Sequence, residues 1–377
     1  MTTESSSDLI PVTLLTGFLG SGKTTVLNHL VRQPELADAL VIINEFGEMA
    51  LDHLLVAHST ENLVMEMSSG CLCCTIRGDL VKTLHDIIWR FSRSGQYQFR
   101  RVLIETTGLA DPAPIIHTLM THPKIAPKYR LDGIVTTVDL VTGMHTLDQH
   151  REAIKQAAVA DTLLLTKADL ATDAQRNVLL RRLDGINPAA ARWEVRNGEI
   201  GPQKVLNLGL FCAEDKTPDV ARWLKEEAYS KPPSHSHHSH DHHAPAHPEH
   251  NDGHYHEHTH DHHDVNRHND HIRAFCFSIN EPIPESVLIA WLDILMDFVG
   301  SNILRIKGIL NVEGQDQPLV VHGVQHIFHP PVPLPAWPGK DRRSRLVFIT
   351  RDVEQDIIET IFRVLRDMLP ETLENAT

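Results

Sequence analysis

The chain has 377 residues, of which 41% are hydrophobic and 22% charged, and its formal net charge is -14. This length exceeds the usual size of a single hydrophobic core, so we expect two domains. The acidic balance argues against nucleic-acid binding, which requires a basic surface. No apolar run reaches the roughly 18 residues of a membrane span, and no secretory signal is visible at the start. The sequence therefore predicts a cytoplasmic protein with no membrane or nucleic-acid partner.

The first part of the chain alternates short apolar runs with longer, helix-like segments. Near-continuous apolar strands separated by such segments are typical of a parallel sheet covered on both faces. We expect an α/β domain with a mostly parallel sheet, spanning residues 1–230. Its predicted strands are 10–17, 39–45, 101–108, 133–139 and 162–169.

A glycine-rich motif follows the first predicted strand. The segment GFLGSGKT fits the pattern G-x-x-x-x-G-K-[ST] and precedes the helical segment TTVLNHLVR. In this context the backbone N–H groups cradle phosphate oxygens, which predicts a P-loop NTPase. Lys23 is predicted to reach the β- and γ-phosphates as a catalytic residue, and the Thr24 hydroxyl to bind Mg²⁺. The predicted nucleotide contacts in this motif are Gly17, Gly20, Ser21, Gly22, Lys23, Thr24 and Thr25.

Three of the chain's 5 cysteines are crowded into the segment SSGCLCCTIRGDL. Cytoplasmic thiols stay reduced, so such a cluster is more often a metal site than a disulfide. The two-residue gap between Cys71 and Cys74 is typical of zinc-binding loops. We expect two or three of Cys71, Cys73 and Cys74 to bind the metal. A water, a histidine, Glu45 or Glu48 would supply a further ligand.

Two other readings of the cysteine cluster remain open, namely a redox dithiol and buried, inert thiols. Thiolate ligands favour zinc or another borderline-soft ion over Mg²⁺. The isolated Cys212 and Cys276 are expected to be small hydrophobic residues.

The segment IETTGLADP, residues 104–112, follows another predicted strand. Glu105 is predicted to hold Mg²⁺ through water as part of the catalytic site, and the Gly108 N–H to meet the γ-phosphate. A loop tied to that phosphate in one nucleotide state and released in the other is a switch. A capped strand-to-helix turn is the alternative. Asp139 and Asp161 remain open between structural and functional roles.

The tetrapeptide TKAD, residues 166–169, ends a predicted strand where guanine-reading N-K-x-D motifs occur. The Asp169 carboxylate can accept two hydrogen bonds from guanine, whereas adenine presents an acceptor there. The Lys167 stem could lie over the base, while Thr166 replaces the usual asparagine. We therefore expect GTP as the nucleotide, with Asn187 near its base.

Residues 231–271 consist almost entirely of His, Asp, Pro, Ser and Asn. Such a segment cannot bury enough apolar surface to offset its ordering entropy, so we expect a disordered linker. Neutral imidazoles bind zinc, nickel, copper and cobalt. This histidine tract is therefore predicted to collect metal ions, with a solvating spacer as the alternative.

The remaining residues, 272–377, predict a small α+β domain. Its strands are expected at 273–279, 302–310, 318–329 and 345–350, and its helices at 284–299 and 353–369. In the last helix the apolar residues at helical spacing are Ile357, Ile361, Val364 and Met368. The sheet around VVHGVQHIFH is expected to be exposed, as a client-docking surface or a structural lid. Its histidines are expected to pack or lie on the surface: His322, His326 and His329.

In this order, the motifs TGFLGSGKTT, INEFGE, GCLCCTIRGDL, IETTGLADP and TKADL resemble those of the CobW-type metal-handling P-loop GTPases. The C-terminal HGVQ, followed by Trp337 and RLVFIT, is similar to that family's second domain. The resemblance covers the chain except for the histidine tract. It implies a GTPase whose C-x-C-C segment binds a metal beside the nucleotide and delivers it to an apo-metalloprotein client.

The sequence leaves alternatives for which metal ion the protein carries and whether it delivers or stores that ion. A zinc chaperone is preferred, because thiolates beside dense histidines suit a borderline-soft ion. A cobalt chaperone for cobalamin assembly and a zinc store with incidental GTPase activity are the other two hypotheses.

Overall fold

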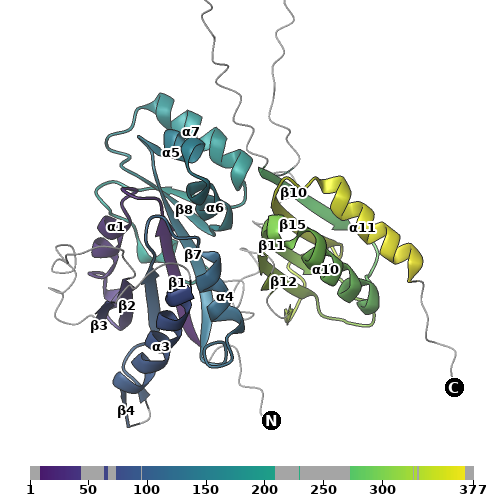
Figure 1. Cartoon of the computed structure of the whole chain (residues 1–377), viewed down its shortest axis with the longest axis horizontal. Helices are drawn as coiled ribbons and strands as arrows, with labels where there is room; N and C mark the ends of the chain where they lie inside the picture. Colours follow the sequence, from purple (N-terminus) through teal and green to yellow (C-terminus); the bar gives the residue numbers. More distant parts are fainter. Residues whose placement is uncertain are drawn as a thin grey trace, which may run out of the picture.

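The computed structural model describes residues 9–43, 63–66, 74–94, 96–208, 229, 272–325, 327–328 and 331–369. Within these ranges the chain forms an N-terminal domain around a large sheet and a C-terminal domain around a second sheet (Figure 1). The histidine tract, with His326 and His329, lies outside the described residues. None of the described helices is long and apolar enough to cross a membrane.

The N-terminal sheet is parallel throughout and has the order β3-β2-β6-β1-β7-β8-β9. The predicted α/β class with a parallel sheet is therefore confirmed. Two short strands, β3 and β9, were not predicted. The strands are β1 (Ile10–Gly17), β2 (Ala39–Ile43), β3 (Leu63–Glu66), β6 (Arg101–Glu105), β7 (Tyr129–Asp139), β8 (Thr162–Thr166) and β9 (Ala191–Glu194).

Helices cover both faces of this sheet. Along β1, Leu14 packs in one core cluster with α3 and α4, whereas the next residue, Leu15, packs in another with α1. This alternation follows from the two-residue period of a strand and explains the continuous apolar runs. The helices are α1 (Lys23–Leu30), α3 (Cys74–Arg90), α4 (Ala113–Thr121), α5 (Gly143–Gln149), α6 (Arg151–Val159) and α7 (Asp173–Ile186). A small hairpin joins β4 (Ser92–Arg93) to β5 (Gln96–Tyr97).

The C-terminal sheet is antiparallel, with the order β10-β15-β11-β12-β13 and with β14 beside β12. Two helices cover one face through an aromatic cluster of Phe277, Trp291 and Phe362. The predicted α+β domain is confirmed. Its elements are β10 (Ile272–Ile279), α10 (Glu285–Val299), β11 (Ile303–Leu310), β12 (Leu319–Val324), β13 (Ile327–Phe328), β14 (Val332–Pro333), β15 (Ser344–Arg351) and α11 (Gln355–Met368). Short 3₁₀ helices span Pro34–Leu36, Pro202–Lys204 and Gly300–Asn302.

The other face of the C-terminal sheet packs against the N-terminal domain. Leu304 and Ile349 share a core cluster with α6 and α7, and Val324 shares another with α4. Figure 1 shows α4 and α6 on this inner side of the sheet, and α11 on the far side. The expectation of an exposed sheet around VVHGVQHIFH was therefore wrong, because both its faces are covered. His322 is buried within β12.

Two local expectations in this domain also differ from the structure. The predicted strand 318–329 is divided into β12 and β13 by a turn in which Gln325 has a left-handed φ of 54°. In α11 the buried residues are Ile358 and Phe362, while Ile357 and Met368 are exposed. The helix has two overlapping sets of apolar residues at helical spacing, the predicted one and the one that contains Ile358 and Phe362. The second set is buried because Phe362 packs against the aromatic rings of the cluster.

Candidate functional site

The glycine-rich motif forms the tight loop between β1 and α1. At Gly17 a side-chain Cβ would lie 2.2 Å from the Thr137 hydroxyl oxygen, so a larger residue does not fit. The Ser21 hydroxyl lies 2.6 Å from the same hydroxyl, and its carbonyl accepts a hydrogen bond of 2.7 Å from Thr166. The loop is therefore fixed from below by the carboxyl ends of β7 and β8.

The first two residues of α1 point their functional groups toward the loop and the neighbouring strand. The Lys23 ammonium is buried and donates to the Phe18 carbonyl at 3.2 Å, inside the loop. The Thr24 hydroxyl donates to a carboxylate oxygen of Glu105 at 3.0 Å. Glu105 ends β6 and is only 3% exposed. The helix N-terminus adds a positive potential suited to phosphate.

The chemistry of this pair fits a magnesium ion. A hydroxyl and a carboxylate are the hard oxygen ligands that Mg²⁺ takes, usually together with water and substrate phosphates. The structure brings Thr24 and Glu105 together from segments far apart in the sequence, as the predicted roles require. Their ligand roles stay predictions.

The segment between β6 and α4, residues 106–112, lies against the phosphate loop. Its Thr106 hydroxyl donates to the Thr16 hydroxyl at 2.8 Å. A Cβ at Gly108 would lie 2.6 Å from the Leu19 backbone nitrogen, so the two loops touch at this point. The predicted switch loop and the phosphate loop are therefore in direct contact. A shift of one loop at this point requires the other to move as well.

The TKAD segment holds its lysine in a fixed position. Lys167 has a left-handed φ of 56°, and its ammonium donates to Asp139 at 2.6 Å. Asp139 also accepts from the Val141 N–H at 2.7 Å and the Thr142 hydroxyl at 2.9 Å. Burial would raise the pKa of Asp139, but these hydrogen bonds, with Lys167 foremost, hold that pKa below its usual value. Asp139 therefore orients Lys167.

Two other residues of the predicted base site differ in their surroundings. Asp169 is exposed, and so accessible to a ligand. Asn187 is buried, and its amide donates to the carbonyls of Ala157, Ala158 and Ala160 at 2.9 to 3.0 Å. These bonds occupy the side chain in a structural role at the end of α6. They lend no support to the prediction that Asn187 lies near the base.

The loop that follows β9 was missed at the sequence level. Gly198 lies directly against the Thr25 backbone at the start of α1, and Ala168 donates its N–H to the Val195 carbonyl. The loop thus borders both predicted nucleotide segments. The Asn-Gly pair at 197–198, in which both residues have positive φ, was the available sign of a tight turn there.

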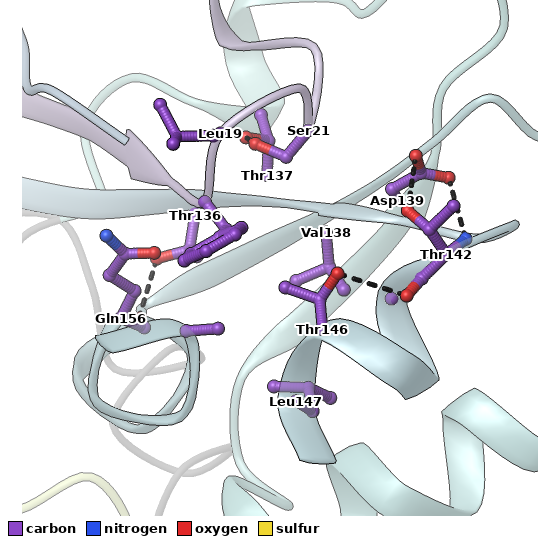
Figure 2. A pocket seen from close by; sticks show the side chains of 13 residues that line it. Leu19, Ser21, Thr136, Thr137, Val138, Asp139, Thr142, Thr146, Leu147 and Gln156 are labelled. Atoms are coloured by element: carbon purple, nitrogen blue, oxygen red, sulfur yellow. Dashed lines mark hydrogen bonds between the residues drawn. The ribbon is translucent and has the colours of Figure 1, made fainter. Parts of the chain in front are cut away.

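A small pocket opens beside the phosphate loop, between β7, α5 and α6. Figure 2 shows Ser21 of the loop beside Thr137, with Asp139 and Thr142 on one side of the pocket and Gln156 on the other. Val138 and Leu147 give it an apolar floor.

Most residues of the predicted metal site lie outside the described residues, namely Cys71, Cys73, Glu45 and Glu48. Cys212 also lies outside them. Cys74 is the first residue of α3, and nothing is described of its side chain. Among the described ranges, no group of three or more His, Cys, Asp and Glu side chains is placed to hold a metal ion.

The fold and the phosphate loop define a P-loop nucleotide-binding protein of the α/β class. Residues 11–193 match the family model of the CobW/HypB/UreG nucleotide-binding domain, and residues 272–366 match the cobalamin synthesis protein cobW C-terminal domain. The chain belongs to the CobW/HypB/UreG family.

Three relatives of this chain carry zinc in their names. The zinc chaperone YjiA of Escherichia coli is 30% identical over 95% of this chain and 99% of its own length. The zinc chaperone CobW of Pseudomonas aeruginosa is 29% identical over 94% of this chain and 91% of its own length. The zinc-regulated GTPase metalloprotein activator 1 of Schizosaccharomyces pombe is 32% identical over 56% of this chain and 52% of its own length.

A solved structure covers the same extent. The crystal structure of Zn(II)-bound YjiA GTPase from Escherichia coli is 27% identical and superposes with a TM-score of 0.65, covering 95% of this chain and 99% of that one.

Proposed function

We propose that this protein is a GTP-hydrolysing metallochaperone that binds zinc through its C-x-C-C segment and delivers the ion to an apo-metalloprotein client. The chain is a P-loop GTPase by its family. The observation that carries the proposal is the convergence of Lys23, Thr24 and Glu105 at one edge of the sheet. The cysteine-bearing segment departs from that same edge.

The topology supports this placement of the two sites. In a parallel sheet all carboxyl ends lie at one edge, where such folds bind their ligands. The phosphate loop follows β1, and the segments with Glu45 and Glu48 and with the cysteines follow β2 and β3. β2 is the direct neighbour of β6, which ends at Glu105. The close pairing of these strands supports a metal site near the nucleotide site.

In this mechanism the phosphate loop binds the triphosphate through its backbone N–H groups and the Lys23 ammonium. A magnesium ion held by Thr24 and Glu105 would supply charge neutralisation at the β- and γ-phosphates. Asp169 reads the guanine edge, while Asp139 holds Lys167 in place. The Gly108 N–H and its loop respond to the γ-phosphate.

The transfer cycle couples these loops to zinc. GTP orders the segments with Glu48 and the cysteines into a tight zinc site, and hydrolysis releases them so that the ion passes to the client. By linkage, zinc must strengthen GTP binding by the same factor by which GTP strengthens zinc binding.

The test is a zinc titration with Mg²⁺ and either GDP or a non-hydrolysable GTP analogue. We expect tighter zinc binding with the analogue, and equal affinities would exclude the switching model. Serine at positions 71, 73 and 74 should abolish tight zinc binding but preserve nucleotide binding. Lys23→Ala should lose nucleotide binding and, with it, the tightening of zinc binding by nucleotide. Competition with Co²⁺ and Ni²⁺ under the same conditions identifies the preferred ion.

A further inference from the structure

The C-terminal domain contacts the 106–112 loop directly. Gln325, in the turn between β12 and β13, donates from its amide to a carboxylate oxygen of Asp111 at 3.2 Å. The other oxygen of Asp111 accepts from the Ala113 N–H at 3.0 Å, at the start of α4. Gln325 is half-buried and holds a left-handed φ of 54°. Its backbone N–H reaches the Leu304 carbonyl, which anchors the turn to β11.

Helix α6 holds the same loop from the N-terminal domain. The Lys155 ammonium donates to the Asp111 oxygen that Gln325 also contacts, at 2.7 Å. The Gln156 amide donates to the carbonyls of Gly108 at 3.2 Å and Ala110 at 3.0 Å. The loop is thus in contact with the phosphate loop at Gly108 and with the C-terminal domain at Asp111.

A second and stronger contact fixes the C-terminal sheet beside this point. The carboxylate of Asp161 accepts from Arg305 and, at 2.5 Å, from Lys307, both on β11. Arg305 also donates to the Val159 carbonyl at the end of α6. Burial would raise the pKa of Asp161, but the charges of Arg305 and Lys307 hold it well below its usual range. Buried charges of this kind separate only at high cost.

The two contacts differ in strength and in what they touch. The Asp161 cluster is buried and joins parts of the domains that carry no nucleotide contact. The Gln325–Asp111 bond is a single, half-buried bond to the loop predicted to follow the γ-phosphate, so it can form and break while the domains stay joined.

We propose that Gln325 is a positioning residue through which the C-terminal domain senses and supports the nucleotide-dependent state of the 106–112 loop. This inference rests on the proposed function, because it requires that the loop respond to the γ-phosphate. With GTP bound, the loop is held by Gly108 at one end and by Gln325 at the other. The loss of the γ-phosphate frees the loop and, with it, the β12–β13 turn.

The experiment compares the full chain with Gln325→Ala and with the matched control Gln315→Ala. Gln315 is exposed in the turn between β11 and β12, at the opposite end of the same strands. We expect Gln325→Ala to lower kcat for GTP hydrolysis about fivefold while KM stays near the wild-type value, because the phosphate cradle is untouched. Gln315→Ala should match the wild type in both. Equal kcat values for the two variants would overturn the proposal.

Hydrogen exchange of the unaltered protein provides a second readout that does not depend on a variant. Backbone amides of β12 and β13 should exchange more slowly with the GTP analogue than with GDP, and identical exchange would also overturn the proposal. Failure of the proposed function would be seen in a different measurement, the zinc titration. In that case zinc affinity is the same in both nucleotide states, whatever kcat and exchange show at Gln325.

Discussion

At the scale of single residues, small hydroxyl side chains shape the phosphate-binding site. Ser21 contacts Thr137, Thr166 donates to the Ser21 carbonyl, and Thr106 donates to Thr16. Buried polar groups are costly unless they are hydrogen-bonded, so these pairs fix the loop in one shape. Thr166 stands where related motifs have asparagine, and its hydroxyl serves as a tie to the loop rather than as a contact to a base.

The close approach of the two loops makes Gly108 sensitive to substitution. In Gly108→Ala, the new Cβ would collide with the Leu19 backbone, so the loops must move apart. We expect a loss of GTP hydrolysis of at least about tenfold, measured as kcat/KM. The control is Gly185→Ala in α7, where no atom lies within 4 Å of the added Cβ. That variant should hydrolyse GTP normally and gain about 0.5–1 kcal/mol in unfolding free energy. Normal turnover in Gly108→Ala would contradict the contact.

At the scale of elements, α6 connects the two domains. Its side chains hold the 106–112 loop, and its last carbonyls accept from Arg305 of β11 and from Asn187. The charged cluster around Asp161 follows the helix directly, next in the chain to Ala160 of a buried apolar cluster.

Removing the central carboxylate should therefore destabilise the protein strongly. Asp161 is only 10% exposed, and Asp161→Ala removes its carboxylate from beside the buried charges of Arg305 and Lys307. We expect a loss of about 3–5 kcal/mol in unfolding free energy, measured by denaturant titration. The control Asp184→Ala removes the partner of Arg192 at a site that is 60% exposed, and should cost less than about 1 kcal/mol. Similar costs for the two variants would show that the cluster contributes little.

The same variant predicts a pH dependence. The pKa of Asp161 is lower in the folded protein than the unfolded value of about 3.9, so its contribution is complete above that pH. It is lost as pH falls through the folded pKa. The gap in stability between the wild type and Asp161→Ala should be constant near neutral pH and shrink in acid below about pH 4.

At the scale of the whole molecule, a segment dense in histidine joins two packed domains. Deletion of residues 234–271 should lower the number of zinc ions bound per chain but leave GTP turnover unchanged, because the predicted nucleotide-binding motifs all lie before that range in the sequence. Metal analysis after dialysis measures this directly. If the deletion also abolished client activation while the cysteine site kept its zinc, the tract would be part of delivery. Retention by the intact chain should also weaken below about pH 6.5, as the imidazoles become protonated.

The parts of the fold that could be predicted are those with a strong local pattern. Long apolar runs such as 10–17 identified the buried parallel strands, and the glycine motif after that strand identified the phosphate loop. Thr24 and Glu105 could both be assigned to magnesium because the phosphate loop follows one predicted strand and Glu105 lies in the segment that ends another. The strands β3 and β9 have only 4 residues each, too short a stretch to stand out as a strand pattern.

Other features depend on partners that a local pattern does not contain. Asn187 was predicted to lie near the base, but its amide donates to three backbone carbonyls at the end of α6, which the local sequence does not reveal. The buried stripe of α11 is decided by the aromatic rings that it meets. Asp161 gave no sign of its role because Arg305 and Lys307 are more than a hundred positions away.

The ionic cluster at Asp161 has a consequence for how the polypeptide comes apart. If one domain unfolded alone, the buried charges of the other domain at this cluster would lose their partners across the interface. The apolar face of the C-terminal sheet that packs against the N-terminal domain would become exposed to water. Melting of one half therefore promotes melting of the other, so the two halves share one cooperative transition. Truncation after the first half would remove part of what keeps that half folded.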